Sequence, residues 1–290
     1  MSKSISARIV SDLLELWPKL TAEESEHMLS EQLSEGEKPC SPPMLLKTRH
    51  EDNENGRVFY INEETDSPYV IFYIHGGGYN YEIILPHWQF IKKLAKETEA
   101  QVIVPAYRLV PFATYREAYD LIVPLYKDFC ETHPDRKIIL MGDSAGGGFS
   151  LALAECFRQE GIRMPDELIL LSPWVDVVMD NPEIADYQPN DPFLSADSLK
   201  AIARHWAGDL DCHDWRISPA YGDLHGIHHV TVFVGTSEIL YPDIIKFYHG
   251  LDDDPSNELI VAKDMNHVYP LMPIQEAKPA VDKIIRTIMR

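Results

Sequence analysis

Short and nearly continuous apolar runs recur along the chain, and they predict buried β-strands. The runs lie at 69–74, 101–105, 137–141, 167–171, 230–234 and 259–262. A strand that is covered on both faces needs an apolar side chain at almost every position, so these runs predict a parallel sheet. Two further strands, at 44–49 and 57–61, flank the polar segment 51–56 and predict a hairpin.

Between these runs, apolar side chains recur every three or four residues, which predicts helices. The expected helices lie at 86–99, 114–130, 195–207, 242–250 and 274–288, with another that begins at Ser144. Pro86 suits a first helical turn, and Ser195 suits an N-cap. Strands that alternate with helices of ten or more residues predict an α/β fold, a mostly parallel sheet with helices on both faces.

Two stretches depart from this alternation. Residues 1–38 have apolar side chains at helical spacing, with Ser11 and Thr21 as candidate helix starts, and Thr21 to Glu24 fits a capping box. The apolar positions are Ile9, Leu13, Leu14, Trp17, Met28 and Leu33. Residues 176–221 are rich in proline and aromatic side chains. We expect one or two amphipathic helices ahead of the main fold and an insertion within it.

Composition narrows the class of protein. The 290 residues fit one large α/β domain, and a net charge of −20 disfavours nucleic acid and anionic membranes as partners. No apolar stretch reaches the roughly 18–20 residues that span a bilayer, and the N-terminus lacks a secretory pattern. Four cysteines at 40, 130, 156 and 212 show no zinc or redox spacing. The expectation is a soluble cytoplasmic protein with reduced thiols and no membrane insertion, and a homo-oligomer is left open.

The strand predicted at 137–141 leads into a glycine-rich pentad at 142–146, Gly-Asp-Ser-Ala-Gly, and a small-residue helical pattern follows. A serine in such a strand-to-helix turn exposes its hydroxyl, and the flanking glycines allow the close approach that the turn requires. Small residues also pack helices against strands for structural reasons alone. The strand before the pentad and the helix after it favour a nucleophile at Ser144.

A serine nucleophile needs a base within hydrogen-bond reach, and the base needs a third group that orients it. Among twelve histidines, His267 lies between the last strand and the last helix, where a late-chain base is expected. Glu238 follows the strand at 230–234 and is the favoured acid. Asp243 is the alternative, although it also suits a helix cap. The histidines at 225, 228 and 229 suit a solvated loop better than a metal site.

The run His75-Gly-Gly-Gly78 ends another buried strand, and three interpretations of it are open. A plain flexible turn and a phosphate-binding loop are two of them, but the spacing matches neither type of phosphate loop. Consecutive glycines can also present backbone N–H groups to the oxyanion of a tetrahedral intermediate. Together with the serine pentad, the run favours an oxyanion hole, and His75 then braces the loop.

These motifs together resemble the hormone-sensitive-lipase-like branch of the α/β hydrolases, which are mainly bacterial carboxylesterases of short-chain esters. The resemblance runs from about residue 69 to the C-terminus and rests on four motifs in order. They are His75-Gly-Gly-Gly-Tyr79, Gly142-Asp-Ser-Ala-Gly-Gly147, Ser172-Pro-Trp174 and Met265-Asn-His267. The family usually has aspartate where this chain has Glu238.

The resemblance implies a role for each matching residue. Ser144 would be the nucleophile, His267 the general base and then acid, and Glu238 the acid of the triad. The N–H groups of Gly77, Gly78 and Ala145 would form the oxyanion hole. Neither a metal nor an organic cofactor is required by this chemistry.

The resemblance also implies a single α/β-hydrolase domain over residues 1–290, in which 1–40 and 176–216 cap the site. A small-molecule ester would bind beneath the cap, against Tyr79, Trp174 and Phe193. Three alternatives compete with this interpretation: an amidase or arylformamidase with the same triad, a non-catalytic small-molecule binder, and a lipase with interfacial activation. An intact triad counts against the binder, and the absence of a long apolar segment counts against the lipase.

Overall fold

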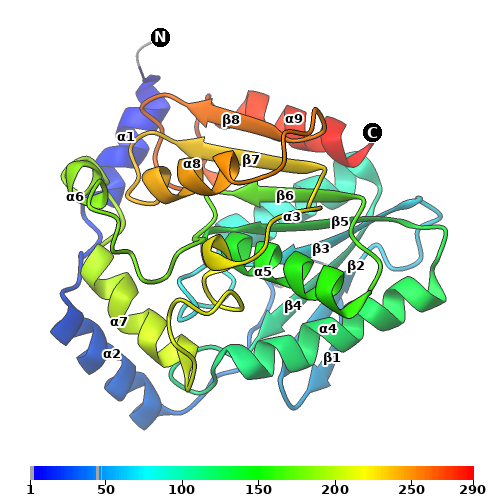
Figure 1. Ribbon diagram of the computed structural model, residues 1–290, viewed down its shortest axis with the longest axis horizontal. Helices are drawn as coiled ribbons and strands as arrows, with labels where there is room; N and C mark the ends of the chain where they lie inside the picture. The colour runs from blue at the N-terminus through cyan, green and yellow to red at the C-terminus, as the bar shows by residue number, and fades with distance from the viewer. Residues whose placement is uncertain (1–2, 44–45, 47) are drawn as a thin grey trace.

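The buried strands pair into one sheet in the computed structural model, which describes residues 3–43, 46 and 48–290. Within this part of the chain, eight strands lie in the order β1-β2-β4-β3-β5-β6-β7-β8 (Figure 1). Their bounds are β1 Arg49–Asn53, β2 Gly56–Ile61, β3 Tyr69–Ile74, β4 Gln101–Tyr107, β5 Lys137–Asp143, β6 Glu167–Leu171, β7 Val230–Gly235 and β8 Glu258–Ala262.

The pairing confirms the mostly parallel sheet that the apolar runs predict. β1 with β2 and β2 with β4 are antiparallel, whereas β4, β3, β5, β6, β7 and β8 run parallel. Ile74 pairs with Gly142, and Leu171 pairs with both Asp143 and Phe233. The carboxyl ends of β3, β5, β6 and β7 therefore lie level with one another, at the edge where α/β sheets bind ligands.

The hairpin is present, but its first strand is displaced from the prediction at 44–49. β1 spans Arg49–Asn53, and its five residues are polar and exposed. Met44, Leu45 and Lys47 lie outside the described residues. An edge strand with both faces in solvent has no apolar pattern by which to recognise it.

The helices follow the predicted periodicity. Their bounds are α1 Ile5–Leu14, α2 Ala22–Glu35, α3 Leu85–Thr98, α4 Tyr115–Thr132, α5 Ser144–Glu160, α6 Ile184–Tyr187, α7 Ala196–Ala207, α8 Tyr241–His249 and α9 Ala277–Ile288. Two short 3₁₀ segments are η1 Pro219–Tyr221 and η2 Tyr269–Leu271. The capping box at Thr21 and the N-cap at Ser195 are confirmed. Ser11 as a helix start is wrong, because Ser4 caps α1 and Ser11 is buried within it.

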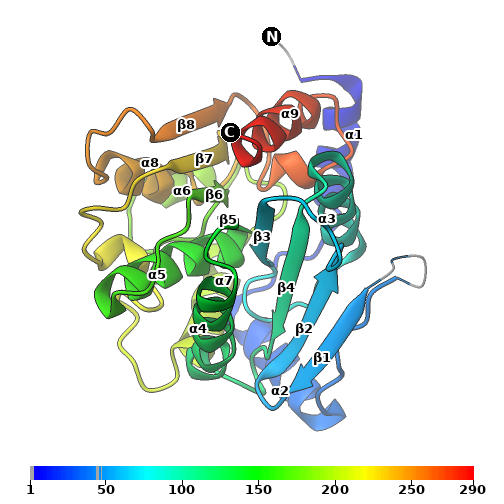
Figure 2. The ribbon, with the colours of Figure 1, turned by 90° about the vertical axis from the view of Figure 1, so that its right-hand side faces the viewer.

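Two apolar cores cover the two faces of the sheet. On one face, α4, α5 and α8 pack their apolar sides onto the strands, and apolar residues of α7 join the same cluster. The helices α1, α3 and α9 lie on the other face (Figure 2). The apolar sides of α3 and α9 pack onto the strands there, and Ala7 of α1 belongs to the same cluster. The α/β architecture is therefore confirmed, and each core excludes water from the strands that lead to the carboxyl edge.

The N-terminal segment packs against the insertion, and α2 lies beside α7 (Figure 1). The Ser25 hydroxyl donates to Ser198 Oγ over 2.9 Å. The Ser195 hydroxyl donates to the carbonyl of Leu20 over 2.8 Å. Two regions more than 150 residues apart in sequence thus form one layer, held by polar contacts as well as by apolar packing.

Helix α1 turns its apolar face outward. Its small residues Ala7 and Ser11 face the body, and Ser11 Oγ accepts a hydrogen bond from Asn266 Nδ2 at 2.8 Å. The large apolar side chains on the outer face of α1 and just beyond it are exposed, namely Ile5, Ile9, Leu13, Leu16 and Trp17. In the described residues, no helix combines the length and apolar character needed to cross a membrane.

Candidate active site

The turn between β5 and α5 places Ser144 at the start of the helix in a left-handed conformation, with φ +53°. Few residues other than glycine adopt this conformation, and it costs on the order of 1–3 kcal/mol. The turn is feasible because Gly146 has no side chain. A Cβ on Gly146 would lie 2.1 Å from the carbonyl oxygen of Ile74. The pentad therefore projects the serine hydroxyl from a tightly packed strand end.

The structure brings Ser144, His267 and Glu238 together. Nε2 of His267 lies 2.8 Å from Ser144 Oγ, and Nδ1 of the same ring lies 2.5 Å from Glu238 Oε2. The neutral tautomer that fits these partners carries its proton on Nδ1, donates it to the carboxylate and accepts the serine hydroxyl on Nε2. Asp243 instead bonds Asn181 Nδ2 at 2.7 Å and does not cap α8.

The second oxygen of Glu238 is also occupied. Glu238 Oε1 accepts hydrogen bonds from the Ser172 hydroxyl at 2.7 Å and from the backbone N–H of Gly235 at 2.9 Å. The Ser172 oxygen in turn accepts the N–H of Val268 at 3.0 Å. Ser172 therefore fixes both the carboxylate and the backbone next to His267. The sequence offered Ser172-Pro-Trp174 only as a family motif, and nothing in it marked this role.

Burial and charge oppose each other at the imidazole. Complete burial would lower the pKa of His267, but the charge and hydrogen bond of Glu238 act in the opposite direction. The more distant carboxylates of Asp191 and Asp143 add to the effect of Glu238, so the pKa of His267 is raised. A base whose cationic form is stabilised in this way can accept the proton of a serine hydroxyl.

The glycine run after β3 lies directly against the serine turn. Gly77 and Gly78 have φ of +108° and +59°, and a Cβ on Gly77 would lie 2.4 Å from the carbonyl oxygen of Tyr81. A Cβ on Gly76 would lie 3.0 Å from Ser144 Cβ. The predicted oxyanion donors of this run are therefore in the loop next to Ser144, and Ala145 follows the serine at the N-terminus of α5.

A buried polar network ties the glycine run to the serine turn. Asp143 Oδ1 accepts the N–H of Gly76 at 3.1 Å and the hydroxyl of Tyr73 at 2.7 Å. Its other oxygen lies 3.1 Å from His87 Nε2. Burial would raise the pKa of Asp143, but His87 and these hydrogen bonds lower it below its usual value. A carboxylate is thus kept ionised between the two loops.

His75 supports the same loop from below. Its Nδ1–H donates to the carbonyl of Gly76 at 2.7 Å, and its ring stacks on Tyr107 with centroids 4.6 Å apart. Burial lowers the pKa of His75 to about 4. The ring is therefore neutral near pH 7, which suits a brace within the core rather than a charged ligand site.

Comparison with protein families places the chain. A family model described as "alpha/beta hydrolase fold" matches residues 71–271, which contain every residue of the constellation above. The chain belongs to this α/β-hydrolase family. Its fold class is confirmed by the same match.

Two curated relatives are similar to about three fifths of the chain. An esterase of Acinetobacter venetianus is 34% identical over 189 residues, which are 64% of this chain and 62% of the relative. An acetyl-hydrolase of Streptomyces hygroscopicus is 28% identical over 60% of this chain and 58% of its own length. The matches thus span about three fifths of these two relatives.

A solved structure extends the likeness to nearly the whole chain. It is described as a hormone-sensitive lipase from a metagenome library, and it superposes with a TM-score of 0.81 at 25% identity. The superposition covers 99% of this chain and 98% of the other. The resemblance to the hormone-sensitive-lipase-like branch, drawn from the four sequence motifs, is confirmed.

The residues expected to contact substrate fall into two groups. Tyr79 and Trp174 are each only 1% exposed, and the ring of Tyr79 stacks between Trp174 and Trp206. Their side chains offer almost no surface to a ligand, and the Tyr79 hydroxyl donates to the carbonyl of Ala145 at 3.0 Å. Phe193 is partly buried, and its ring centroid lies 6.5 Å from that of His267.

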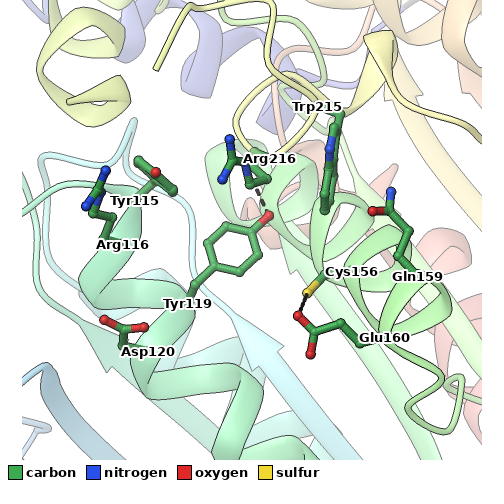
Figure 3. A pocket seen from close by; sticks show the side chains of 9 residues that line it. All are labelled: Tyr115, Arg116, Tyr119, Asp120, Cys156, Gln159, Glu160, Trp215 and Arg216. Carbon is green, nitrogen blue, oxygen red and sulfur yellow. Dashed lines mark hydrogen bonds between the residues drawn. The ribbon is translucent and has the colours of Figure 1, made fainter. Parts of the chain in front are cut away.

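Two other regions with candidate chemistry lie apart from the constellation. Among the clustered histidines, His225 and His228 pair at the surface with Asp252 and Asp254, at 2.8 Å and 3.2 Å. A hollow of about 600 Å³ lies between α4, α5 and Trp215 (Figure 3). Its two arginines are paired with Asp209 and Asp214. Sequence reasoning did not anticipate this hollow, and it contains none of the expected site residues.

Proposed function

We propose that this protein is a serine hydrolase that cleaves carboxylic esters through an acyl-enzyme. The observation that carries the proposal is the continuous hydrogen-bonded chain from Ser144 Oγ through His267 to Glu238. This order of nucleophile, base and acid is the arrangement that activates a serine hydroxyl on several unrelated folds. The names of the family relatives, esterase and acetyl-hydrolase, support the same chemistry.

In the first half of the reaction, Ser144 Oγ attacks the ester carbonyl carbon while His267 Nε2 takes the hydroxyl proton. The carbonyl oxygen becomes an oxyanion, which the N–H groups of Gly77, Gly78 and Ala145 would stabilise. Each preorganised donor of this kind lowers the barrier by roughly 3–4 kcal/mol. The intermediate then collapses, the C–O bond breaks, and His267 returns the proton to the departing alcohol.

In the second half, water replaces the alcohol. His267 accepts a proton from the water as its oxygen attacks the acyl carbon, and a second tetrahedral intermediate forms in the same hole. On collapse, the bond between the acyl carbon and Ser144 Oγ breaks, the carboxylic acid is released, and His267 Nε2 returns the proton to Ser144 Oγ. Glu238 stays ionised throughout, orients the ring and stabilises the imidazolium. The chain's own residues provide every group in this cycle, so no cofactor is invoked.

We propose short acyl esters as the substrate class. Phe193 stands close to His267, and Trp17 meets Phe193 edge-on with ring centroids 6.3 Å apart. These rings come from the two segments, 1–40 and 176–216, that we propose as the cap of a single-domain enzyme. Aromatic walls of this kind suit the apolar part of a small ester. Tyr79 and Trp174 would not contact the substrate, and they would instead support the oxyanion loop.

The decisive experiment compares the wild-type chain with Ser144→Ala on p-nitrophenyl acetate and butyrate. We expect a loss of 10³-fold or more in kcat for the variant, whose circular dichroism should stay unchanged. Undiminished turnover would refute the proposal. A chain-length series of esters, run beside an aryl-amide and formamide panel, separates an esterase from an amidase that uses the same groups. Binding without turnover by the wild-type chain would instead favour the small-molecule binder.

A further inference from the structure

Asp191 is a completely buried carboxylate that the reaction described above does not use. It lies in the loop between α6 and α7, within the segment 176–216, and its side chain is 0% exposed. Burying an ionisable group is costly unless hydrogen bonds replace its water. The hydrogen bonds that this carboxylate accepts therefore have to offset the free-energy cost of burying it.

The carboxylate joins two parts of the site. Oδ1 accepts the backbone N–H groups of Phe193 and Leu194, each at 2.8 Å, and so closes a turn of its own loop. Oδ2 accepts the N–H of Ile239 at 2.9 Å. Phe193 faces the ring of His267, whereas Ile239 directly follows Glu238. One side chain thus connects the aromatic wall of the site to the backbone of its acid.

The backbone of the same loop is tied to the N-terminal segment. The Lys19 ammonium donates to the carbonyl of Asp191, and Ser195 donates to that of Leu20. Trp17, two residues before Lys19, meets Phe193 edge-on. The loop is therefore held from outside by the N-terminal segment and from inside by its own carboxylate.

The three N–H donors specify a carboxylate rather than another turn-forming side chain. Asparagine or serine can close the turn at 193–194, because that turn needs one acceptor atom. Two acceptor atoms that point in different directions require an ionised acid, since an asparagine would aim its NH₂ group at the N–H of Ile239. The acid also places a negative charge near His267, where it raises the pKa of the ring.

We propose that Asp191 is a positioning residue, which fixes the Phe193 loop onto the Glu238 segment and helps to stabilise the imidazolium of His267. The expected effect of Asp191 on turnover rests on the proposed serine-hydrolase function. The hydrogen bonds by which Asp191 joins the Phe193 loop to the Glu238 segment do not depend on that function. The charged groups that act on His267 are Glu238, Asp191 and Asp143. Removing Asp191 leaves the other two in place.

The kinetic test compares Asp191→Asn with a matched control, Asp176→Asn. Asp176 is also buried, and it accepts hydrogen bonds from the backbone N–H of Val178 and from the Tyr221 hydroxyl, each at 2.9 Å. Neither hydrogen bond involves Ser144, His267 or Glu238. We expect Asp191→Asn to lower kcat/KM for p-nitrophenyl butyrate about tenfold to a hundredfold, mainly in kcat, because the catalytic groups are misplaced. The acidic limb of its pH profile should move to lower pH, and the profile of Asp176→Asn should not.

A spectroscopic test measures the coupling between the Asp191 carboxylate and the His267 ring without any turnover of substrate. In wild-type chain labelled with ¹⁵N-histidine and ¹³C-aspartate, the Asp191 carboxyl resonance should shift at the midpoint of the His267 titration. That midpoint should fall in Asp191→Asn. The inference would be overturned if the Asp191 resonance of the wild-type protein did not change during the His267 titration. It would also be overturned if Asp191→Asn left both the midpoint of that titration and kcat/KM unchanged. If wild-type chain hydrolyses no ester, the proposed function fails, and the two resonances still test the positioning role.

Discussion

Glu238 and Asp243 are five residues apart, and their surroundings give them different chemistry. Glu238 contacts His267 and accepts two further hydrogen bonds, whereas Asp243 bonds Asn181 on the other side of the segment. Burial raises the pKa of Asp243 to about 6. The position of each carboxylate relative to the imidazole, rather than its place in the sequence, is therefore the reason that we propose Glu238 as the acid.

We predict that Glu238→Gln lowers kcat for a p-nitrophenyl ester by roughly 10³- to 10⁴-fold, because the amide favours the wrong imidazole tautomer. Asp243→Asn should retain most of the activity. Both changes remove one charge and conserve shape, so each variant controls for the other. Steady-state kinetics at several pH values measure the effect. A large loss in Asp243→Asn alone would mean that the acid is Asp243.

Glu155 presents another buried carboxylate, near the C-terminal end of α5, whereas Ser144 begins that helix. It is 0% exposed, and neither oxygen has a hydrogen-bond partner among the described residues. Burial raises its pKa from 4.5 to about 8, although Arg158 acts in the opposite direction. The folded protein therefore keeps a proton that the unfolded chain releases between these two pH values.

The linkage predicts how stability depends on pH. Between pH 4.5 and about 8, the Glu155 carboxyl binds a smaller fraction of a proton in the unfolded chain than in the folded protein. The contribution of Glu155 to the free energy of unfolding therefore falls as pH rises through this range. Glu155→Gln removes this contribution. Urea unfolding at pH 5 and at pH 8 should show a smaller decrease for the variant than for the wild-type chain. Parallel curves for the two proteins would contradict the prediction.

At the scale of elements, the glycine-rich start of α5 determines how closely the helix approaches its neighbours. A Cβ on Gly148 would lie 1.9 Å from the carbonyl oxygen of Trp174, a backbone atom that cannot turn aside. Alanine normally stabilises a helix interior by up to about 1 kcal/mol relative to glycine. At this position, the close approach reverses that preference.

We therefore predict that Gly148→Ala lowers the free energy of unfolding by about 1–3 kcal/mol, as overpacked cores do. Gly250→Ala serves as the control, since its φ of −85° suits any residue. The Cβ would lie 3.1 Å from the carbonyl oxygen of Phe247, a contact that a shift of a few tenths of an ångström relieves. Its effect should be small in either direction. The midpoints of urea unfolding compare the two, and equal midpoints would show that the backbone adjusts.

The sequence predicted those elements whose pattern reflects burial. The strands at 69–74 and 137–141 and the helix at 195–207 follow from apolar continuity or period. β1 escaped because its exposed polar residues have no such pattern. The short helix α6 also escaped, since four residues are too few to show a helical period.

The candidate site was predictable to the extent that it lies at strand ends. Ser144 and Glu238 each follow a buried strand, and His267 follows the half-buried edge strand β8, so the sheet topology brings all three to one edge. Asp191 was missed because it lies in an irregular loop, and its partners are backbone N–H groups that have no signature in the sequence. The inward packing of Tyr79 and Trp174 depends on side-chain rotations that strand order does not determine.

At the scale of the whole molecule, the outer face of α1 and the residues just beyond it present five large apolar side chains to solvent. Contiguous apolar side chains on a surface promote association or adsorption. Leu13 and Leu16 are 61% and 79% exposed, so folding buries little of either. Their contribution to the stability of the isolated chain is correspondingly small.

We predict that the double variant Leu13→Lys, Leu16→Lys changes the free energy of unfolding by at most about 0.5 kcal/mol. It should also elute earlier from a hydrophobic-interaction column than the wild-type chain. Ala7→Lys is the matched control on the opposite face of the same helix, where the side chain is 2% exposed. That variant should be clearly destabilised. A comparable loss of stability in the double variant would mean that α1 packs the other way round.

The order of the strands along the chain determines when the site is completed during the synthesis and folding of each molecule. The serine belongs to the middle of the chain, but its proposed partners arrive with β7 and with the segment after β8, the strand at the edge of the sheet. A ribosome-bound chain that ends before residue 267 has the serine turn without its base. Hydrolysis would begin only when the last strand has docked, so enzymatic activity in a refolding experiment reports completed assembly rather than early collapse.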